Sequence, residues 1–169
     1  DGRQFRYAID RAFQVAGSGR VVTGTVFNGV LRTGERAVLS PCGVEVRVRA
    51  LQQNGRTVQQ VAAGARCAIN LSGTDVARAA RGEWLVAPAL HAPTQHLDVR
   101  LHVCTTESQP LKHWTPVHLH LGTADIPARI AIRRGEAIAP GASGLVRIIA
   151  DRPIAALHGD RFVVRDQYA

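Results

Sequence analysis

The chain has 169 residues, 46% of them hydrophobic, and 21 Lys and Arg residues against 13 Asp and Glu residues give it a formal net charge of +8. This composition excludes an intrinsically disordered chain, and no apolar run is long enough to cross a bilayer. Because the polar start Asp1-Gly2-Arg3-Gln4 does not resemble a secretion leader, we expect a soluble, cytoplasmic protein that does not bind a membrane.

The positive charge comes almost entirely from arginine, since Lys112 is the only lysine. Arginine makes planar, bidentate contacts with phosphate, and a positive field favours polyanions without specifying which one. GC-rich coding also replaces lysine with arginine without any functional reason. The charge therefore favours contact with nucleic acid, with coding bias as the alternative.

The first half of the chain has the two-residue periodicity of β-strands. Val44, Val46 and Val48 alternate with charged residues, and Asn54-Gly55 then predicts a hairpin turn because both residues tolerate positive φ. A single short helix is expected at 75–80, with Thr74 as its N-cap and Gly82 just beyond its end. The other expected strands are 5–15, 20–26, 37–39, 66–71 and 83–86.

A linker is expected at 87–94, where Pro88 and Pro93 lack the N–H group that a central strand needs. Many short strands at close spacing indicate barrels or a sandwich. We therefore expect an all-β fold of two consecutive small antiparallel β-barrels, 1–91 and 92–169, with one larger sandwich as the alternative. The strands expected after the linker are 97–104, 117–123, 128–132, 144–149 and 161–165.

No motif predicts catalysis, so we assign no catalytic residue. The chain has no phosphate-binding loop, no nucleophile elbow and no H-E-x-x-H pair, and Gly17-Ser18-Gly19 is expected to be a tight turn. His118 and His120 share a strand face, as do His102 and Cys104. A solvent-exposed barrel face that carries histidines is favoured over a metal site. The three cysteines are expected to be small core residues in a reducing compartment, and we predict no bound metal or other cofactor in this chain.

Several segments carry a resemblance to translational GTPases such as elongation factor Tu. Residues 5–15 followed by 17–26 resemble the opening of the second domain of those proteins, and Gly29, Gly34-Glu35, 44–51 and 64–71 continue the pattern. Residues 161–166 resemble the closing strand of the third domain. The resemblance is strong over the first barrel and rests on order and pattern over residues 95–160.

Within that superfamily the chain resembles the selenocysteine-specific elongation factors. Elongation factor Tu has two acidic residues in place of Asp10-Arg11 and lacks an arginine in place of Arg66. The resemblance implies that Asp10, Arg11 and Arg66 bind a selenocysteinyl group. It also implies a GTPase domain with GTP and Mg before Asp1, and winged-helix modules after Ala169.

The chemistry of a selenol suits this assignment. A selenol is more acidic than a thiol and is an anion at neutral pH, so Arg11 and Arg66 can make charge-assisted contacts with it. Asp10 either holds an arginine or accepts the substrate's α-ammonium group. Adjacent residues of a regular strand point to opposite faces, so either a bulge brings Asp10 and Arg11 together or one residue acts from behind the pocket. Phe13 and Asn70 are expected to flank the pocket.

The function that the resemblance implies is delivery of selenocysteinyl-tRNA to the ribosome by a monomer. The first barrel would bind the aminoacyl end, and Arg129, Arg133 and Arg134 are candidates to contact the RNA backbone from the second barrel. Two alternatives remain. One is the corresponding part of another translational GTPase, and the other is a protein-docking β-barrel module with no role in RNA binding.

Overall fold

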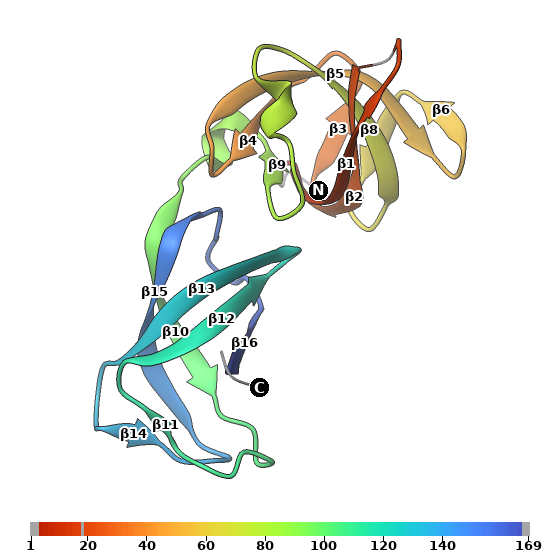
Figure 1. Ribbon diagram of the computed structural model, residues 1–169. Helices are drawn as coiled ribbons and strands as arrows, with labels where there is room; N and C mark the ends of the chain where they lie inside the picture. Colours follow the sequence, from red (N-terminus) through yellow and green to blue (C-terminus); the bar gives the residue numbers. More distant parts are fainter. Residues whose placement is uncertain (1–3, 18, 167–169) are drawn as a thin grey trace. The chain divides into compact units, whose positions relative to one another are not determined.

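The computed structural model describes residues 4–17 and 19–166, and the described part of the chain divides into two compact units. One unit contains Asp1–Pro93 together with Gly122–Ala124, and the other contains Thr94–Leu121 and Asp125–Ala169. Nearly all regular structure consists of antiparallel strands, so the expected all-β class is confirmed (Figure 1). The alternative of one larger sandwich is wrong.

The first unit is built around a closed barrel. Its main sheet has the order β4-β9-β1-β2-β8-β5-β6, and β4 also pairs with β5, which closes six of these strands into a ring. Strands β3 and β7 form a separate two-stranded sheet. The strands of this unit are β1 (Arg6–Val15), β2 (Gly19–Asn28), β3 (Val30–Arg32), β4 (Arg36–Ser40), β5 (Val44–Gln53), β6 (Arg56–Val58), β7 (Gln60–Ala62), β8 (Arg66–Ser72) and β9 (Trp84–Val86).

The barrel core follows from the alternation of apolar and polar residues. On β8, Cys67, Ile69 and Leu71 are at most 4% exposed, whereas the residues between them face outward. The same pattern holds on β5, where Val46 and Val48 are buried between exposed charged residues. Because each buried aliphatic side chain contributes about 1.5–3 kcal/mol, this inward face is what holds the ring together.

The expected hairpin at Asn54-Gly55 is confirmed. Gln53 pairs with Arg56, and the two turn residues have φ of 52° and 74°. This is the backbone that a two-residue turn between twisted strands requires. At the other expected turn, Ser18 lies outside the described residues.

The short helix expected at 75–80 is present but covers only three residues, and its N-cap is not the expected Thr74. The segment contains a 3₁₀ helix, η1 (Val76–Arg78), whose N-cap is Asp75 in a left-handed conformation with no side-chain cap. A segment this short cannot repay the cost of nucleating an α-helix. Its end is instead held by Arg20, whose Nε donates a hydrogen bond of 3.1 Å to the Ala79 carbonyl oxygen. The expected linker contains a second 3₁₀ helix, η2 (Pro88–Leu90).

The second unit is a half-barrel rather than a closed barrel. Its main sheet has the order β10-β15-β13-β12-β16, and β11 pairs with β14 in a small separate sheet. The buried residues come from one face of each strand, among them Leu119, Ile130 and Ile148, none of which is exposed. The strands are β10 (Thr94–His102), β11 (Leu111–Lys112), β12 (Thr115–Leu121), β13 (Ala124–Ile132), β14 (Ala137–Ile138), β15 (Ser143–Ile154) and β16 (Phe162–Asp166).

The expectation that all three cysteines are core residues is correct only for Cys67. Cys42 is half-buried and Cys104 is exposed. Strand β10 ends at His102, so Cys104 lies in the following loop and does not share a strand face with His102. Sequence alternation overestimated the length of this strand because the apolar Val103 continues the pattern beyond its last ladder pair, His102 with Ser143.

Candidate functional site

A bulge in β1 gives the candidate site its shape. Ile9 is opposite Gly24 and Arg11 is opposite Thr23, so Asp10 is an extra residue with no partner on β2. Ile9 points into the core with no exposed surface, whereas Arg11 is exposed. Because the extra residue shifts the alternation by one position, Asp10 and Arg11 both lie on the outer face of the barrel. Of the two arrangements that the sequence left open, the bulge is the one observed.

Cross-strand pairing brings the other predicted residues onto the same face. Arg11 is in one row with Thr23 and Ala68, and Phe13 is in the next row with Val21 and Asn70. Arg66 is opposite Thr25, two positions along β8 from Ala68. The five residues predicted for the first barrel, Asp10, Arg11, Phe13, Arg66 and Asn70, therefore share one surface across β1, β2 and β8.

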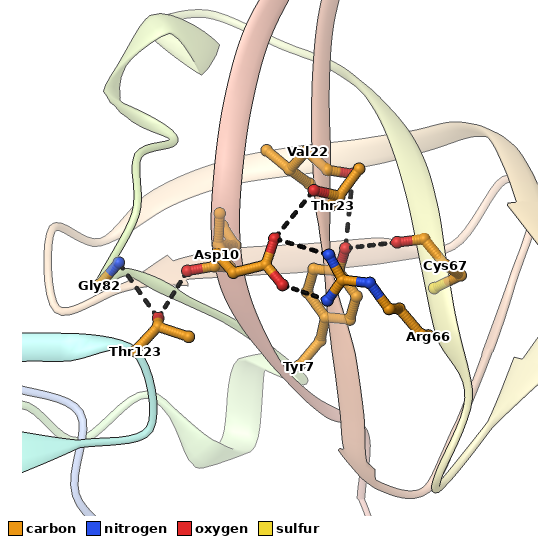
Figure 2. Close-up of polar contacts among 9 residues, drawn as sticks. Tyr7, Asp10, Val22, Thr23, Arg66, Cys67, Gly82 and Thr123 are labelled. Carbon is orange, nitrogen blue, oxygen red and sulfur yellow. Dashed lines mark hydrogen bonds and ion pairs between the residues drawn. The ribbon is translucent and has the colours of Figure 1, made fainter.

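The Asp10 carboxylate is the centre of this surface (Figure 2). Oδ1 accepts hydrogen bonds from Thr23 Oγ1 at 2.9 Å and from Arg66 Nη2 at 3.2 Å, and Oδ2 accepts one from Arg66 Nη1. Both ends of the guanidinium fork are thus held by one carboxylate. The Arg66 side chain is nevertheless 58% exposed, against 22% for Asp10. Asp10 therefore orients an arginine that stays accessible from solvent.

The charges on this surface do not balance. Hydrogen bonds from Arg66, and to a smaller extent from Thr23, hold the pKa of Asp10 below its ordinary value of 3.8, although partial burial opposes this. Arg11 forms no ion pair or hydrogen bond with its guanidinium among the described residues. One carboxylate beside two guanidinium groups leaves a net charge of +1, so the surface is suited to a monoanion.

The barrel wall beneath the cluster is neutral and well packed. The Tyr7 hydroxyl donates a hydrogen bond of 2.9 Å to the Cys67 carbonyl oxygen, which ties β1 to β8 across β2. Burial raises the pKa of Tyr7 and raises that of the Cys67 thiol to about 11. Both groups are therefore uncharged at neutral pH, and the charge of the site comes from its outer layer alone.

Asn70 and Phe13 differ in how they face solvent. Phe13 is 41% exposed, which is high for a large aromatic side chain. Asn70 is half-buried, and its Oδ1 atom is buried with no hydrogen-bond partner among the described residues. Phe13 thus offers an apolar surface beside Arg11, and Asn70 lies at the β8 end of the row that contains Phe13.

Acid is expected to weaken the first unit through Asp10. Since its folded pKa is lowered, this carboxylate adds stability above its unfolded pKa of about 3.9, and that stability is lost as the pH falls through the folded pKa. The unfolding free energy should therefore fall as the pH drops below about 4, by less than about 1 kcal/mol for this half-exposed pair. Urea unfolding of wild type and Asp10→Asn, followed by fluorescence of the buried Trp84, measures the difference.

Asp98→Asn is the matched control for this acid effect. Asp98 pairs with Arg147 in the second unit, and hydrogen bonds from that arginine likewise lower its pKa. Its substitution should leave the unfolding transition that Trp84 fluorescence reports as sensitive to acid as in wild type. An Asp10→Asn chain that keeps the full acid dependence of that transition contradicts the prediction.

The three arginines predicted for the second unit are all exposed. Arg129 lies on β13, and Arg133 and Arg134 lie in the bend that follows this strand. Trp114 was not predicted from the sequence; it is 49% exposed and has Arg129 over its ring, with 5.8 Å from Cζ to the ring centroid. The signal in the sequence was an aromatic residue directly after Lys112-His113.

Two histidines of the second unit, His118 and His120, lie beside one another, and His118 also contacts a carboxylate. His118 Nδ1 lies 2.7 Å from Asp125 Oδ1, and the rings of His118 and His120 stack with 6.5 Å between centroids. Among residues 4–17 and 19–166, no group of three or more His, Cys, Asp and Glu side chains is placed to hold a metal ion. Over the same residues, no helix has the length and apolar character needed to span a membrane.

Comparison with known families identifies the class of both units. Residues 19–86 match the model of elongation factor Tu domain 2, which covers the closed barrel from β2 to β9; Arg66 and Asn70 lie within the match, whereas β1 with Asp10 and Arg11 precedes it. Residues 98–169 match the β-barrel domain of selenocysteine-specific elongation factor. The chain therefore consists of barrel domains of a translation elongation factor.

Individual relatives define the family further. The selenocysteine-specific elongation factor of Desulfomicrobium baculatum is 38% identical over 95% of this chain, and that of Haemophilus influenzae is 33% identical over 96%. A solved structure of translation elongation factor SelB from Methanococcus maripaludis in its apo form has the same fold, with a TM-score of 0.83 at 22% identity over 99% of this chain and 40% of that one. The chain belongs to the selenocysteine-specific elongation factors, and it spans about a quarter of the length of these curated relatives.

Proposed function

We propose that this chain is the part of a selenocysteine-specific elongation factor that binds selenocysteinyl-tRNA, and that Arg11 and Arg66 hold the anionic selenocysteinyl side chain. The observation that carries the proposal is the outer-face cluster of Asp10, Arg11 and Arg66, with its net charge of +1. A selenolate is a monoanion at neutral pH, so its binding neutralises the cluster.

Each residue has a distinct part in this proposal. Asp10 positions the Arg66 guanidinium through two of its N–H groups, so that the remaining donors face the ligand. Arg11 supplies a second guanidinium, which forms no ion pair with a described carboxylate. Phe13 and Asn70 line the adjacent row and limit the space beside the ligand. The α-ammonium group of the substrate is not needed to explain the presence of Asp10.

The same arrangement disfavours a seryl group. A neutral hydroxyl cannot balance the charge of Arg11, and the arginines lose water on binding without gaining a charged partner. A site built on charged hydrogen bonds rejects a ligand that lacks them more strongly than an apolar pocket rejects a similar shape. Charge, more than size, would therefore separate selenocysteine from its biosynthetic precursor serine.

The remaining parts of the proposal concern the whole protein. It would deliver the tRNA to the ribosome as a cytoplasmic monomer, and it would bind GTP with Mg in a GTPase domain and carry winged-helix modules outside this chain. Arg129, Arg133 and Arg134 would contact the RNA backbone from the second unit. These contacts would release counterions, so binding should weaken steeply as salt is added.

The test compares the affinity of the full-length protein for selenocysteinyl-tRNA and for the same tRNA charged with serine. We expect the first to bind about 10- to 150-fold more tightly, because one hydrogen bond to a charged group contributes about 1.5–3 kcal/mol and 1.4 kcal/mol corresponds to a factor of ten. Equal affinities contradict the selenocysteine assignment and favour another translational GTPase. Undetectable or salt-insensitive tRNA binding favours a protein-docking module.

Cysteinyl-tRNA separates the effect of charge from that of shape. A thiol is neutral at pH 7 and ionises near pH 8.5. The affinity for the cysteinyl form should therefore rise between about pH 7 and pH 9 while the affinity for the seryl form stays constant. A cysteinyl affinity that does not change with pH contradicts recognition of an anion.

A further inference from the structure

Trp114 is an exposed tryptophan held in an unfavourable backbone conformation. It lies in the turn between β11 and β12, its side chain is 49% exposed, and its φ is 67°. Positive φ is rare for a bulky residue and persists only where the surrounding structure imposes it. Here the Trp114 N–H donates a hydrogen bond of 2.7 Å to the Ile130 carbonyl oxygen of β13. The fold thus presents an indole to solvent in a defined place.

The neighbouring histidine fixes the same turn to the sheet. The Ile132 N–H donates a hydrogen bond of 3.1 Å to His113 Nδ1, so this ring nitrogen acts as an acceptor. The His113 and Trp114 rings lie 6.0 Å apart at an interplanar angle of 25°. Two bonds to β13 and one ring contact therefore restrict the turn, and little conformational entropy remains to be lost when a ligand binds to the indole.

Arg129 stands over the indole at a distance that leaves its face open. Its Cζ atom is 5.8 Å from the Trp114 ring centroid, whereas Arg6 lies 3.8 Å from the centroid of the buried Trp84. The second value is a close stacking contact in the first unit, and the first is near the outer limit of a cation–π interaction. A planar group can therefore occupy the indole face once Arg129 turns toward an anion beside it.

The surface around Trp114 is positively charged. The residues near the turn in sequence or on β13 and its following bend include four basic side chains and two acidic side chains, which gives a net charge of +2. Among the described residues, none of the four basic side chains forms an ion pair. The basic side chains are Lys112, Arg129, Arg133 and Arg134, and the acidic ones are Asp125 and Glu136.

We propose that Trp114 is a stacking platform for an unpaired nucleobase of RNA, with Arg129 contacting an adjacent phosphate. The inference rests on the proposed RNA-binding function of the chain and adds a class of contact to it. Aromatic side chains among arginines bind bases that are free to unstack, whereas paired RNA is contacted through phosphates and 2′-hydroxyl groups. The carboxylates of an acidic protein segment would pair with the arginines but do not themselves stack on an indole.

Tryptophan fluorescence of the 169-residue chain provides the test, because Trp114 is half-exposed and Trp84 is only 2% exposed. The probes are an eight-nucleotide single-stranded RNA and a blunt duplex of the same sequence, titrated at low salt. We expect the single strand to quench the emission, and the duplex to bind with much less quenching. The quenching should disappear in Trp114→Leu, whose affinity for the single strand should fall about 5- to 150-fold, the equivalent of about 1–3 kcal/mol per stacked base.

Two further variants separate stacking from charge and from folding. Trp114→Phe keeps an aromatic face and should keep most of the single-strand affinity, and circular dichroism shows whether Trp114→Leu is folded. Arg129→Gln should weaken binding of both RNAs. Equal quenching by duplex and single strand, or RNA affinity that is unchanged in a folded Trp114→Leu, overturns the stacking proposal while leaving RNA binding intact. Absence of binding to either RNA overturns it as well, whereas the selenocysteinyl assignment is judged separately by the comparison of charged tRNAs.

Discussion

Replacing Arg66 by alanine is expected to lower the affinity of the full-length protein for selenocysteinyl-tRNA about 10- to 150-fold, the equivalent of one lost hydrogen bond to a charged group. The affinity for seryl-tRNA should change by less than about threefold, within the effect of removing one surface charge. The variant also leaves the Asp10 carboxylate without its guanidinium partner. The site would then carry no net charge, and its preference for an anion should disappear.

The controls for Arg66→Ala separate selectivity from general charge. Arg66→Lys keeps the charge but cannot bond both oxygens of Asp10 with one planar fork, so it should recover only part of the selectivity. Arg56 is exposed in β6 of the same unit, outside the cluster. Arg56→Ala should therefore change both affinities equally. An Arg66→Ala protein in which selenocysteinyl and seryl affinities fall together identifies Arg66 as a general RNA contact.

Gly24→Ala is expected to destabilise the first unit by about 3 kcal/mol or more, which is at the upper end of the effects of single substitutions. A Cβ atom at this position would lie 1.9 Å from the Ala8 carbonyl oxygen and 3.0 Å from Tyr7 Cζ. The first contact is with backbone, so relief requires β1 and β2 to separate next to the Asp10 bulge. The substitution should therefore disturb the charged surface as well as the barrel.

Gly144→Ala provides the matched control. There the added Cβ would meet the end of the Ile138 side chain at 2.6 Å, which can change rotamer at a cost of about 1 kcal/mol. Urea unfolding measures both variants, with Trp84 reporting on the first unit and Trp114 on the second. An unchanged Trp84 transition in Gly24→Ala contradicts the close approach of β1 and β2.

Local patterns in the sequence were sufficient for most of the fold. Alternating Val44, Val46 and Val48 predicted a strand with one buried face, and Asn54-Gly55 predicted the turn that the structure contains. The prediction was least accurate where local preference was weak. The segment 75–80 is too short to form an α-helix by itself, and contacts such as Arg20 with the Ala79 carbonyl determine its conformation.

Local patterns in the sequence also predicted only part of the candidate site. Alternation along β8 puts Arg66 and Asn70 on the face opposite Cys67, Ile69 and Leu71, and those three residues are buried. The alternation of inward and outward side chains along β1 could not place Asp10 beside Arg11. A bulge depends on how β1 pairs with β2, and neither strand's sequence alone predicts it. Trp114 escaped prediction for a similar reason, since its φ is imposed by a hydrogen bond to a residue 16 positions later, Ile130.

By itself, the sequence determined that this is a basic all-β chain and which side chains carry charge on the outer face of β8, because strand alternation and charge are local properties. Only the tertiary structure decided the partner of Asp10. Its carboxylate meets an arginine 56 residues away because β1 and β8 both pair with β2. That pairing sets which charges cancel, and it leaves Arg11 and one face of Arg66 available to an anion.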